Sequence, residues 1–313
     1  ATSSPPAPVK MPIQAELDGM EPPLRVPVDY QRVLDQAALD AWLERLRTAE
    51  LFAFDTETTS LNYLDARIVG VSFAVSPGEA AYVPLAHDYP GAPDQLDRAA
   101  VLAQLQPLLE DPTRLKLGQH LKYDLHVLAN HGVALRGIRH DTLLESYVLD
   151  STARHDLDSL AERHLQLRTI HFEDVAGKGA KQLTFNQVPL EQAGPYAAED
   201  ADVTLRLHRC LWPRLEREAR LQRLYQELEI PLIEVLARME RIGVRVDAAA
   251  LRRHSGELAK RLQELEQHAY ELAGTRFNLG SPKQLQAILF EQMGLPVGKK
   301  TATGQASTAE DVL

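Results

Sequence analysis

The sequence has very little cysteine and no long apolar run, and each shortage excludes a class of protein. Its 313 residues include one cysteine, Cys210. A single thiol can form neither an internal disulfide nor a thiolate metal site, and it fits a reducing cytosol. No apolar run approaches the roughly 18 residues that span a bilayer, and the first residues lack the basic and apolar segments of a secretory signal. We therefore expect a cytoplasmic protein.

Positive charge is also scarce. Lys and Arg number 34 against 44 Asp and Glu, which gives a formal net charge of −10. A chain coated in phosphate-binding surface carries the opposite sign. Residues 251–300, by contrast, hold more Lys and Arg than Glu. We therefore expect any contact with nucleic acid to be local, with metal ions screening the acidic groups.

Changes in composition divide the chain into three parts. Residues 1–27 are rich in proline with small or polar neighbours, which indicates an extended linker. Strand and helix patterns alternate over residues 28–215, whereas residues 216–313 are almost wholly helical in pattern. This organisation predicts an α/β domain, with a mixed sheet and flanking helices, followed by an incomplete helical segment. The chain does not begin with Met, which favours an excised fragment or a processed terminus.

Apolar periodicity and turn residues place the individual elements. Strands are expected at Leu51–Glu57, Ile68–Val75 and Ala80–Leu85, which would form an antiparallel meander, and at Leu115–Leu117. Helices are expected at Asp40–Glu50, Arg98–Glu110, from Leu121 to Gly132, Thr142–Leu149, Ser159–Leu167 with Ser159 as its cap, Leu251–Leu272, and after Ser281 as a cap. Residues 168–190 are expected to form a loop. The later helices should be interrupted at Pro189, Pro213 and Pro231.

The strand Leu51–Glu57 ends in two carboxylates, Asp55 and Glu57. Side chains alternate along a strand, so positions i and i+2 point to one face. Carboxylates held side by side repel and raise each other's pKa unless a cation lies between them. Hard oxygen ligands placed in this way suit Mg²⁺ or Mn²⁺ rather than zinc. Taken alone, the same motif also fits an acidic strand end in a solvated turn.

Further carboxylates complement this pair. Asp124 lies in the first turn of its helix, near an end of the sheet, where an acidic residue also complements the helix dipole. Tyr196 and Asp200 are four positions apart on a helix and share a face, and the small alanines between them leave room for a ligand. We expect Glu199 to be a lesser candidate, and Asp202 to lie in solvent on another face of the helix.

The glycine-rich segment and the histidines give no comparable signal. Gly177–Lys181 lacks the spacing of a phosphate-binding P-loop, so a basic loop is the better interpretation. The histidines show no paired H-x-x-x-H spacing of the kind that binds metals. We expect surface or capping roles for His87, His126, His131, His140, His155 and His171.

These motifs, in this order, resemble the proofreading 3′–5′ exonuclease domain of the DEDD superfamily, tyrosine subtype. The segments that carry the resemblance are Phe54–Thr58, Gly118–Asp124, Asp158–Glu162 and Tyr196–Asp202. Together they are similar to the bacterial family A DNA polymerases, the DNA polymerase I family, from about residue 28 to the end of the chain. Residues 220–313 resemble the start of that family's thumb, including Lys299–Thr301 and Ser307–Thr308.

The resemblance implies a ribonuclease-H-like mixed sheet with flanking helices, followed by a truncated all-helical thumb segment. It implies two divalent ions, Mg²⁺ or Mn²⁺, whose ligands are Asp55, Glu57, Asp124 and Asp200. One ion would activate a water, and the other would stabilise the leaving 3′ oxygen. Tyr196 would orient that water or contact the scissile phosphate, because a tyrosine with a pKa near 10 is a poor base at pH 7.

The resemblance also implies substrate-binding residues, namely Leu61, Gln119, Tyr123 and Phe172. Leu61 would wedge against the terminal base and Phe172 would stack on a nucleotide, although both also fit ordinary packing roles. Stacking suits a single strand that is bound without sequence preference. His120, where many relatives carry Asn, is expected beside the site without being a ligand.

The implied partner is the 3′ end of a single DNA strand, bound by a monomeric, nucleoid-associated bacterial protein. The palm, fingers and 5′-nuclease regions of the family are not found in the sequence, so we expect no primer extension by this chain. Two alternatives remain. A catalytically silent DNA-binding module is disfavoured because all four acids and the tyrosine are present. An RNA-trimming exonuclease is disfavoured because the C-terminal part is polymerase-like.

Overall fold

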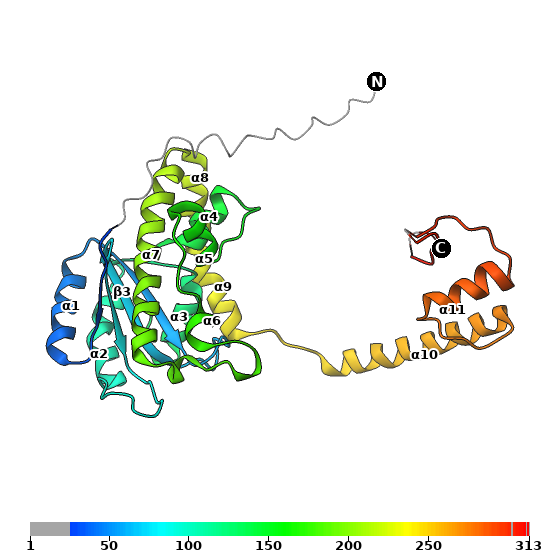
Figure 1. Cartoon of the computed structure of the whole chain (residues 1–313), viewed down its shortest axis with the longest axis horizontal. Helices are drawn as coiled ribbons and strands as arrows, with labels where there is room; N and C mark the ends of the chain where they lie inside the picture. Colours follow the sequence, from blue (N-terminus) through cyan, green and yellow to red (C-terminus); the bar gives the residue numbers. More distant parts are fainter. Residues whose placement is uncertain (1–25, 302, 311, 313) are drawn as a thin grey trace, which may run out of the picture. The chain divides into compact units, whose positions relative to one another are not determined.

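A computed structural model describes residues 26–301, 303–310 and 312, and Figure 1 shows it coloured along the sequence. Contacts divide the chain into two compact units, Ala1–Gly243 and Val244–Leu313. Most of the expected linker, residues 1–27, lies outside the described residues. The expected domain boundary after residue 215 stays a prediction.

The first unit is built on a mixed sheet of six strands, counted over the described residues. Their order across the sheet is β1-β4-β3-β2-β5-β6, with bounds Asp29–Arg32 (β1), Leu51–Thr58 (β2), Ile68–Ser76 (β3), Glu79–Pro84 (β4), Leu115–Gly118 (β5) and Ile138–Asp141 (β6). Strands β2, β3 and β4 form the antiparallel meander that the sequence predicts, while β1, β5 and β6 pair in parallel with their neighbours. Strands β1 and β6 have no counterpart in the prediction, because their sequences, DYQR and IRHD, contain neither an apolar run nor an apolar alternation.

Helices flank the sheet close to the positions that periodicity predicts. Their bounds in the first unit are Gln36–Thr48 (α1), Arg98–Leu109 (α2), Leu121–Ala129 (α3), Thr142–Leu149 (α4), Leu157–Leu160 (α5), Ala161–Leu165 (η2), Phe172–Ala176 (α6), Gly179–Lys181 (η3), Phe185–Gln187 (η4), Leu190–Glu216 (α7), Ala219–Leu224 (α8), Tyr225–Glu229 (η5) and Ile230–Ile242 (α9). In the part of the chain that the structure describes, none of the helices combines the length and apolar character that crossing a membrane requires.

Two local expectations are wrong. Asp156, not Ser159, caps α5, because its carboxylate accepts a hydrogen bond from the backbone N–H of Ser159 at 3.0 Å. A carboxylate is favoured at this position since its negative charge also interacts with the positive end of the helix. The expected loop at 168–190 contains the short helices α6, η3 and η4. His171 caps α6 through a capping box with Asp174, as a histidine in a capping role was expected to do.

Helix α7 continues through two prolines, so the expected interruption at Pro213 is also wrong. A proline inside a helix removes one hydrogen bond. Helix α7 contacts strands β1 to β5, and this packing against the sheet outweighs the missing bond. Pro189 does precede α7 as its N-cap. At Pro231 the chain stays helical, because α8 continues through the π-helical turn η5 directly into α9, so the interruption expected there is wrong too.

Alternate residues of β2 face two different cores. Phe52 and Phe54 pack with residues of α1, α2 and α3 on one face of the sheet. Ala53 lies on the other face with alanines of α7, and these small side chains let the helix approach the sheet closely. Figure 1 shows α7 running along this face. The alternation therefore turns Asp55 and Glu57 toward α7 as well.

The second unit is helical. Helix α10 spans Ala248–Ala273, α11 spans Pro282–Gln286, and the π-helical turn η6 spans Ala287–Gln292. Ser281 caps α11 by accepting a hydrogen bond from the backbone N–H of Gln284, as predicted. A mixed sheet with flanking helices, followed by a helical segment, confirms the predicted fold class.

Candidate active site

Three carboxylates from two elements meet between the sheet and α7. Asp55 and Glu57 lie on β2, and Asp200 lies on α7. One carboxylate oxygen from each residue lies within 4.8 Å of the other two. Oxygen atoms gathered in this way can hold a hard divalent cation. The structure therefore brings together the strand pair and the helix carboxylate that the sequence singles out.

Burial raises the pKa of each carboxyl group in this cluster, and repulsion raises those of Glu57 and Asp200 further. Burial raises the pKa of Asp55 from 3.8 to about 6. Burial, followed by the charges of Asp55, Asp200 and Asp124, raises the pKa of Glu57 well above its ordinary value. Burial and then the charge of Asp55 raise the pKa of Asp200. Oε1 of Glu57 is also buried without a hydrogen-bond partner among the described residues, so the cluster holds negative charge that the protein does not compensate.

Asp124 joins the cluster from α3. Its side chain is buried, and Oδ1 accepts a hydrogen bond from the hydroxyl of Thr56, which lies between Asp55 and Glu57 on β2. Burial raises the pKa of Asp124 well above its ordinary value, and the charge of Asp55 raises it further. Thr56 thus holds α3 against β2 and keeps the Asp124 carboxylate within the electrostatic field of the strand pair.

The start of α3 is fixed by Asp141, a residue that the sequence analysis did not single out. Asp141 caps α4, where Oδ1 accepts a hydrogen bond from the backbone N–H of Leu143 at 3.0 Å. The same carboxylate accepts hydrogen bonds from the backbone N–H groups of His120 and Leu121, at 3.1 and 2.8 Å. One buried side chain therefore positions two helices, and the first of them carries Asp124. An Asp directly before the apolar run of α4 is the signal that could have identified it.

Tyr196 lies one turn before Asp200 on α7. The centroid of its ring lies 5.7 Å from that of Phe185 and 6.3 Å from that of Phe172. Burial raises the pKa of the Tyr196 phenol, and the charge of Asp200 raises it further. The hydroxyl therefore stays protonated at neutral pH, so it can donate a hydrogen bond but cannot serve as a base.

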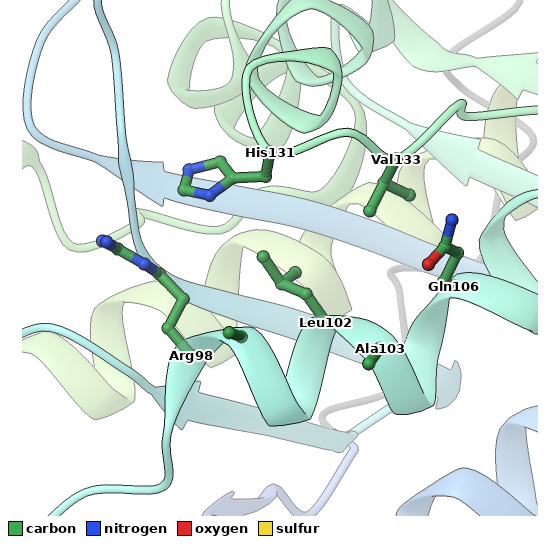
Figure 2. A pocket seen from close by; sticks show the side chains of 7 residues that line it. Arg98, Leu102, Ala103, Gln106, His131 and Val133 are labelled. Atoms are coloured by element: carbon green, nitrogen blue, oxygen red, sulfur yellow. The ribbon is translucent and has the colours of Figure 1, made fainter.

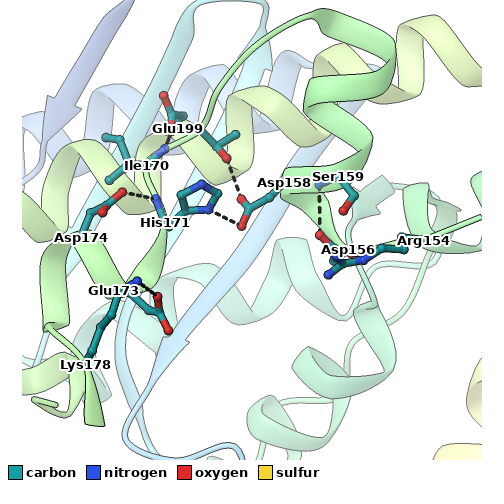
Figure 3. A network of polar contacts seen from close by, with 11 residues as sticks. Arg154, Asp156, Asp158, Ser159, Ile170, His171, Glu173, Asp174, Lys178 and Glu199 are labelled. Carbon is teal, nitrogen blue, oxygen red and sulfur yellow. Dashed lines mark hydrogen bonds and ion pairs between the residues drawn. The ribbon is translucent and has the colours of Figure 1, made fainter.

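A polar network holds the segment before α6 beside α7 (Figure 3). Asp158 accepts a hydrogen bond from Nδ1 of His171 at 2.6 Å, and this bond raises the pKa of His171. Glu199 accepts a hydrogen bond from the backbone N–H of Ile170 at 2.6 Å. These contacts fix the position of the next residue, Phe172, whose side chain is 37% exposed. Glu199 thus has a structural partner outside the carboxylate cluster.

The expectation that Asp202 lies in solvent is wrong, because it is 0% exposed. Oδ2 accepts a hydrogen bond from the hydroxyl of Tyr30 at 2.8 Å, and Oδ1 accepts one from the backbone N–H of Gly78 at 2.7 Å. Gly78 lies in the turn between β3 and β4 with a φ of 82°, which glycine adopts without strain. Helical periodicity shows which face of the helix a residue lies on, but not which other element packs against that face. Asp202 fixes α7 against the sheet, and with it the position of Asp200.

The residues expected to contact substrate have different surroundings. Leu61 follows β2 and is 92% exposed. The hydroxyl of Tyr123 donates a hydrogen bond to the carbonyl of Ser60 at 2.6 Å and so supports the segment that carries Leu61. The amide of Gln119 donates to the carbonyl of His155 at 2.7 Å and accepts from a threonine hydroxyl of α4. The roles of all these residues in substrate binding stay predictions.

The expectation of surface histidines is wrong for His87, His126 and His140, which are buried. Nε2 of His87 lies 2.7 Å from the hydroxyl oxygen of Tyr82, and Nε2 of His126 lies 2.8 Å from a carboxylate oxygen of Glu240 on α9. His140 lies in a buried cluster of its own. Spacing along one helix cannot reveal partners that other elements contribute.

A cavity of about 250 Å³ beside α2 is lined by none of these carboxylates (Figure 2). Arg98 on its wall donates a hydrogen bond to the carbonyl of Ile68 at 2.9 Å. Nε2 of His131, on the opposite wall, accepts a hydrogen bond from the backbone N–H of Ile68 at 3.1 Å. Both polar groups therefore hold the start of β3, and the remaining wall is largely apolar.

Fold and site together define a class: an α/β protein with a partly buried carboxylate cluster between its sheet and a long helix, where a divalent cation can bind. One family model, described as 3′–5′ exonuclease, matches residues 30–216, and another, described as DNA polymerase family A, matches residues 248–313. The first match covers more than half of the chain. The chain therefore belongs to the 3′–5′ exonuclease family associated with family A DNA polymerases, as its motifs predict.

Individual relatives agree with this assignment. DNA polymerase I of Pseudomonas aeruginosa is 64% identical over 296 residues, which cover 94% of this chain and 32% of the relative. DNA polymerase I of Rhizobium leguminosarum is 47% identical, with coverage of 91% and 30%. The solved POL domain of Pol1 from M. smegmatis, in complex with DNA primer-template and dNTP, has a TM-score of 0.70 and 29% identity, covering 90% of this chain and 44% of that one. The chain spans about a third of the length of the curated relatives it matches.

Proposed function

We propose that this chain removes nucleotides from the 3′ end of single-stranded or frayed DNA by metal-dependent hydrolysis, as the proofreading part of a DNA polymerase I-like enzyme. The observation that supports this most is the partly buried cluster of Asp55, Glu57 and Asp200, with Asp124 beside it, inside the segment that matches the exonuclease family. In this proposal residues 28–215 form the exonuclease domain, and residues 216–313 form the beginning of the polymerase part.

The donor set fits Mg²⁺ or Mn²⁺, and we propose two ions. Every ligand on offer is a carboxylate oxygen, which these hard cations prefer. The unpartnered Oε1 of Glu57 and the raised pKa values indicate a site that gains from added positive charge. The proposed ligands are Asp55, Glu57, Asp124 and Asp200. When bound, the cations activate water and neutralise charge that develops on the phosphate.

The side chains around the cluster position the DNA end. The protonated hydroxyl of Tyr196 donates a hydrogen bond to the attacking water or to an oxygen of the scissile phosphate. Phe172 stacks on a nucleotide, and Leu61 wedges against the terminal base, both from partly or fully exposed positions. Base stacking tolerates any sequence because every base has an aromatic face.

Digestion of a single DNA strand labelled at its 5′ end tests the proposal. With Mg²⁺ or Mn²⁺, the strand should shorten step by step from the unlabelled 3′ end. With EDTA, shortening should stop, and with Ca²⁺ the DNA should bind but remain largely uncut, because the larger ion takes looser coordination. A parallel digestion of an RNA strand of the same sequence shows whether the chain trims RNA instead of DNA. Full digestion in EDTA, or no digestion with any metal, would contradict the proposal.

Two variants separate the metal ligands from the tyrosine. Asp200→Ala removes a ligand, so it should weaken Mn²⁺ binding and remove nearly all cleavage. Tyr196→Phe keeps the ring and its packing, so Mn²⁺ and DNA binding should survive while single-turnover cleavage falls by roughly a hundredfold to a thousandfold. Asp94→Ala, which removes an exposed carboxylate, is the matched control and should cleave at the parent rate. Cleavage by Tyr196→Phe at that same rate would make Tyr196 a packing residue.

A further inference from the structure

A second buried cluster of metal-ligand side chains lies outside the carboxylate site. It consists of His140 on β6, Glu145 on α4 and His208 on α7. Nδ1 of His140 lies 2.9 Å from Oε1 of Glu145, and Nδ1 of His208 lies 2.8 Å from the same oxygen. All three ligand atoms lie within 4.8 Å of one another. Three separate elements thus direct their donors to one point.

The protein leaves Glu145 incompletely satisfied. Its side chain is 0% exposed, and Oε2 has no hydrogen-bond partner within residues 26–301, 303–310 and 312. An unpaired carboxylate oxygen in the interior is unfavourable, and such a group calls for an explanation. Burial raises the pKa of Glu145 from 4.5 to about 7; the hydrogen bond from His140 lowers it, and the negative charge of Asp141 raises it further. A cation at this point would supply the missing partner.

Both imidazoles are uncharged, which is the charge state that binds metals. Burial lowers the pKa of His208 to about 4, and burial also lowers the pKa of His140. Both rings are therefore neutral at pH 7, and a metal need not displace a proton from an imidazolium. Without metal, the two Nδ1 atoms can share one carboxylate oxygen by donating hydrogen bonds to it. With metal, the proton of each neutral ring must lie on Nε2 instead, and the two Nδ1 atoms then act as ligands.

Aromatic rings cover one side of the cluster. The ring centroid of Trp212 lies 4.5 Å from that of His140 and 5.6 Å from that of Tyr225. His140 and His208 each keep 7% of their surface exposed, so the edge of the cluster meets solvent. A mainly apolar surrounding strengthens the attraction between a cation and its ligands. Trp212 also provides a spectroscopic reporter beside the cluster.

We propose that His140, Glu145 and His208 form a transition-metal site, suited to Zn²⁺ and distinct from the all-carboxylate cluster. Two imidazole nitrogens and one carboxylate are a donor set of three-ligand zinc sites, in which water takes the fourth position. All-oxygen ligands favour Mg²⁺ or Mn²⁺ instead, so the two clusters differ in the metal that their ligands prefer. Because the ligands come from β6, α4 and α7, the ion links three elements of the first unit and stabilises their arrangement.

Metal binding by the full chain, with Mg²⁺ in large excess to occupy the carboxylate cluster, tests the proposal. After dialysis against Zn²⁺ and removal of loose ions, elemental analysis should find one zinc per chain. Co²⁺ should give visible absorption bands and quench the fluorescence of Trp212, because this ring lies beside His140. In a Trp212→Phe chain the absorption should remain while the quenching is lost. Added Zn²⁺ should displace Co²⁺ and raise the melting temperature.

Two conservative variants remove ligands while keeping the packing. Glu145→Gln keeps the shape and one acceptor oxygen, and His140→Phe keeps a ring against Trp212. Each should weaken Zn²⁺ binding at least about tenfold and abolish the zinc-dependent rise in melting temperature. His268→Ala, which removes an exposed histidine of α10, is the matched control and should keep the zinc.

The proposal is overturned if the parent chain binds no zinc above background, or if both variants bind it as the parent does. Should both variants fail to fold, the cobalt experiment decides alone. Quenching of Trp212 that Zn²⁺ reverses would then support the site, and its absence would overturn it. None of these readouts depends on nuclease activity, so failure here leaves the proposed function untouched.

Discussion

Removing one carboxylate from the candidate active-site cluster should stabilise the metal-free chain while it removes a proposed metal ligand. Burial raises the pKa of Asp55 from 3.8 to about 6. The folded state therefore holds this proton more tightly than the unfolded chain does. The resulting stabilisation is fully present below about pH 4 and is lost as the pH rises through about 6. At neutral pH, a shift of roughly two pKa units corresponds to about 3 kcal/mol of lost stability.

Asp55→Asn removes this titration. In EDTA at about pH 7.5, the variant should exceed the parent by about 3 kcal/mol in free energy of unfolding, and at about pH 5 by about half as much. The melting temperature should rise by roughly 6–12 °C for a unit of this size. Urea denaturation followed by circular dichroism measures the difference. Asp94→Asn, at an exposed position, is the control and should match the parent.

Bound metal should reverse the order of stability of the parent and the variant. Added Mn²⁺ stabilises the chain that binds it, so the parent should gain stability and Asp55→Asn should gain little. An Asp55→Asn chain that is no more stable than the parent in EDTA at about pH 7.5 would refute the reasoning, because the buried charge would then carry no cost. A gain from Mn²⁺ that is equal in both chains would show that Asp55 is not a ligand.

Three further substitutions test the supports of the site. Asp202→Ala leaves the buried N–H of Gly78 and the partly buried hydroxyl of Tyr30 without an acceptor, and it should lower the free energy of unfolding by about 2–5 kcal/mol in urea; a loss below about 1 kcal/mol would contradict this. Gly70→Ala places a methyl group 2.2 Å from the hydroxyl oxygen of Tyr82, so this buried ring must move. Thermal melts should show a loss of several degrees, and an unchanged melt would mean that the ring adapts freely. Asp141→Ala removes the acceptor of the backbone N–H groups at the starts of α3 and α4. In NMR experiments these amides should exchange hydrogen faster, whereas the amides of α10 should be unchanged.

The sequence predicts most of the local structure, namely the strands, the helices and the faces on which their residues lie. Apolar runs separated by turn residues place β2, β3 and β4 and their antiparallel order, because strand pairing through short turns leaves few alternatives. The two-residue repeat of β2 places Asp55 and Glu57 on one face. The four-residue spacing of Tyr196 and Asp200 places them on one face of α7 in the same way.

The sequence does not predict contacts between distant elements. Asp202 has the spacing of a surface residue, and only the β3–β4 turn packed against α7 explains its burial. His140 and His208 lie on different elements, so no spacing rule could pair them through Glu145. Asp141 accepts hydrogen bonds from the starts of both α3 and α4, which becomes evident only once β5 and β6 are paired.

The carboxylate cluster takes its members from β2, α3 and α7, which lie early, midway and late in the first unit. A growing polypeptide therefore releases Asp55 and Glu57 from the ribosome long before Asp200, and contacts between such distant residues form late in folding. Under the proposed function, an unfinished or misfolded chain cannot degrade DNA. The capacity to cut appears only when α7 packs against the sheet, because that packing brings Asp200 to Asp55 and Glu57.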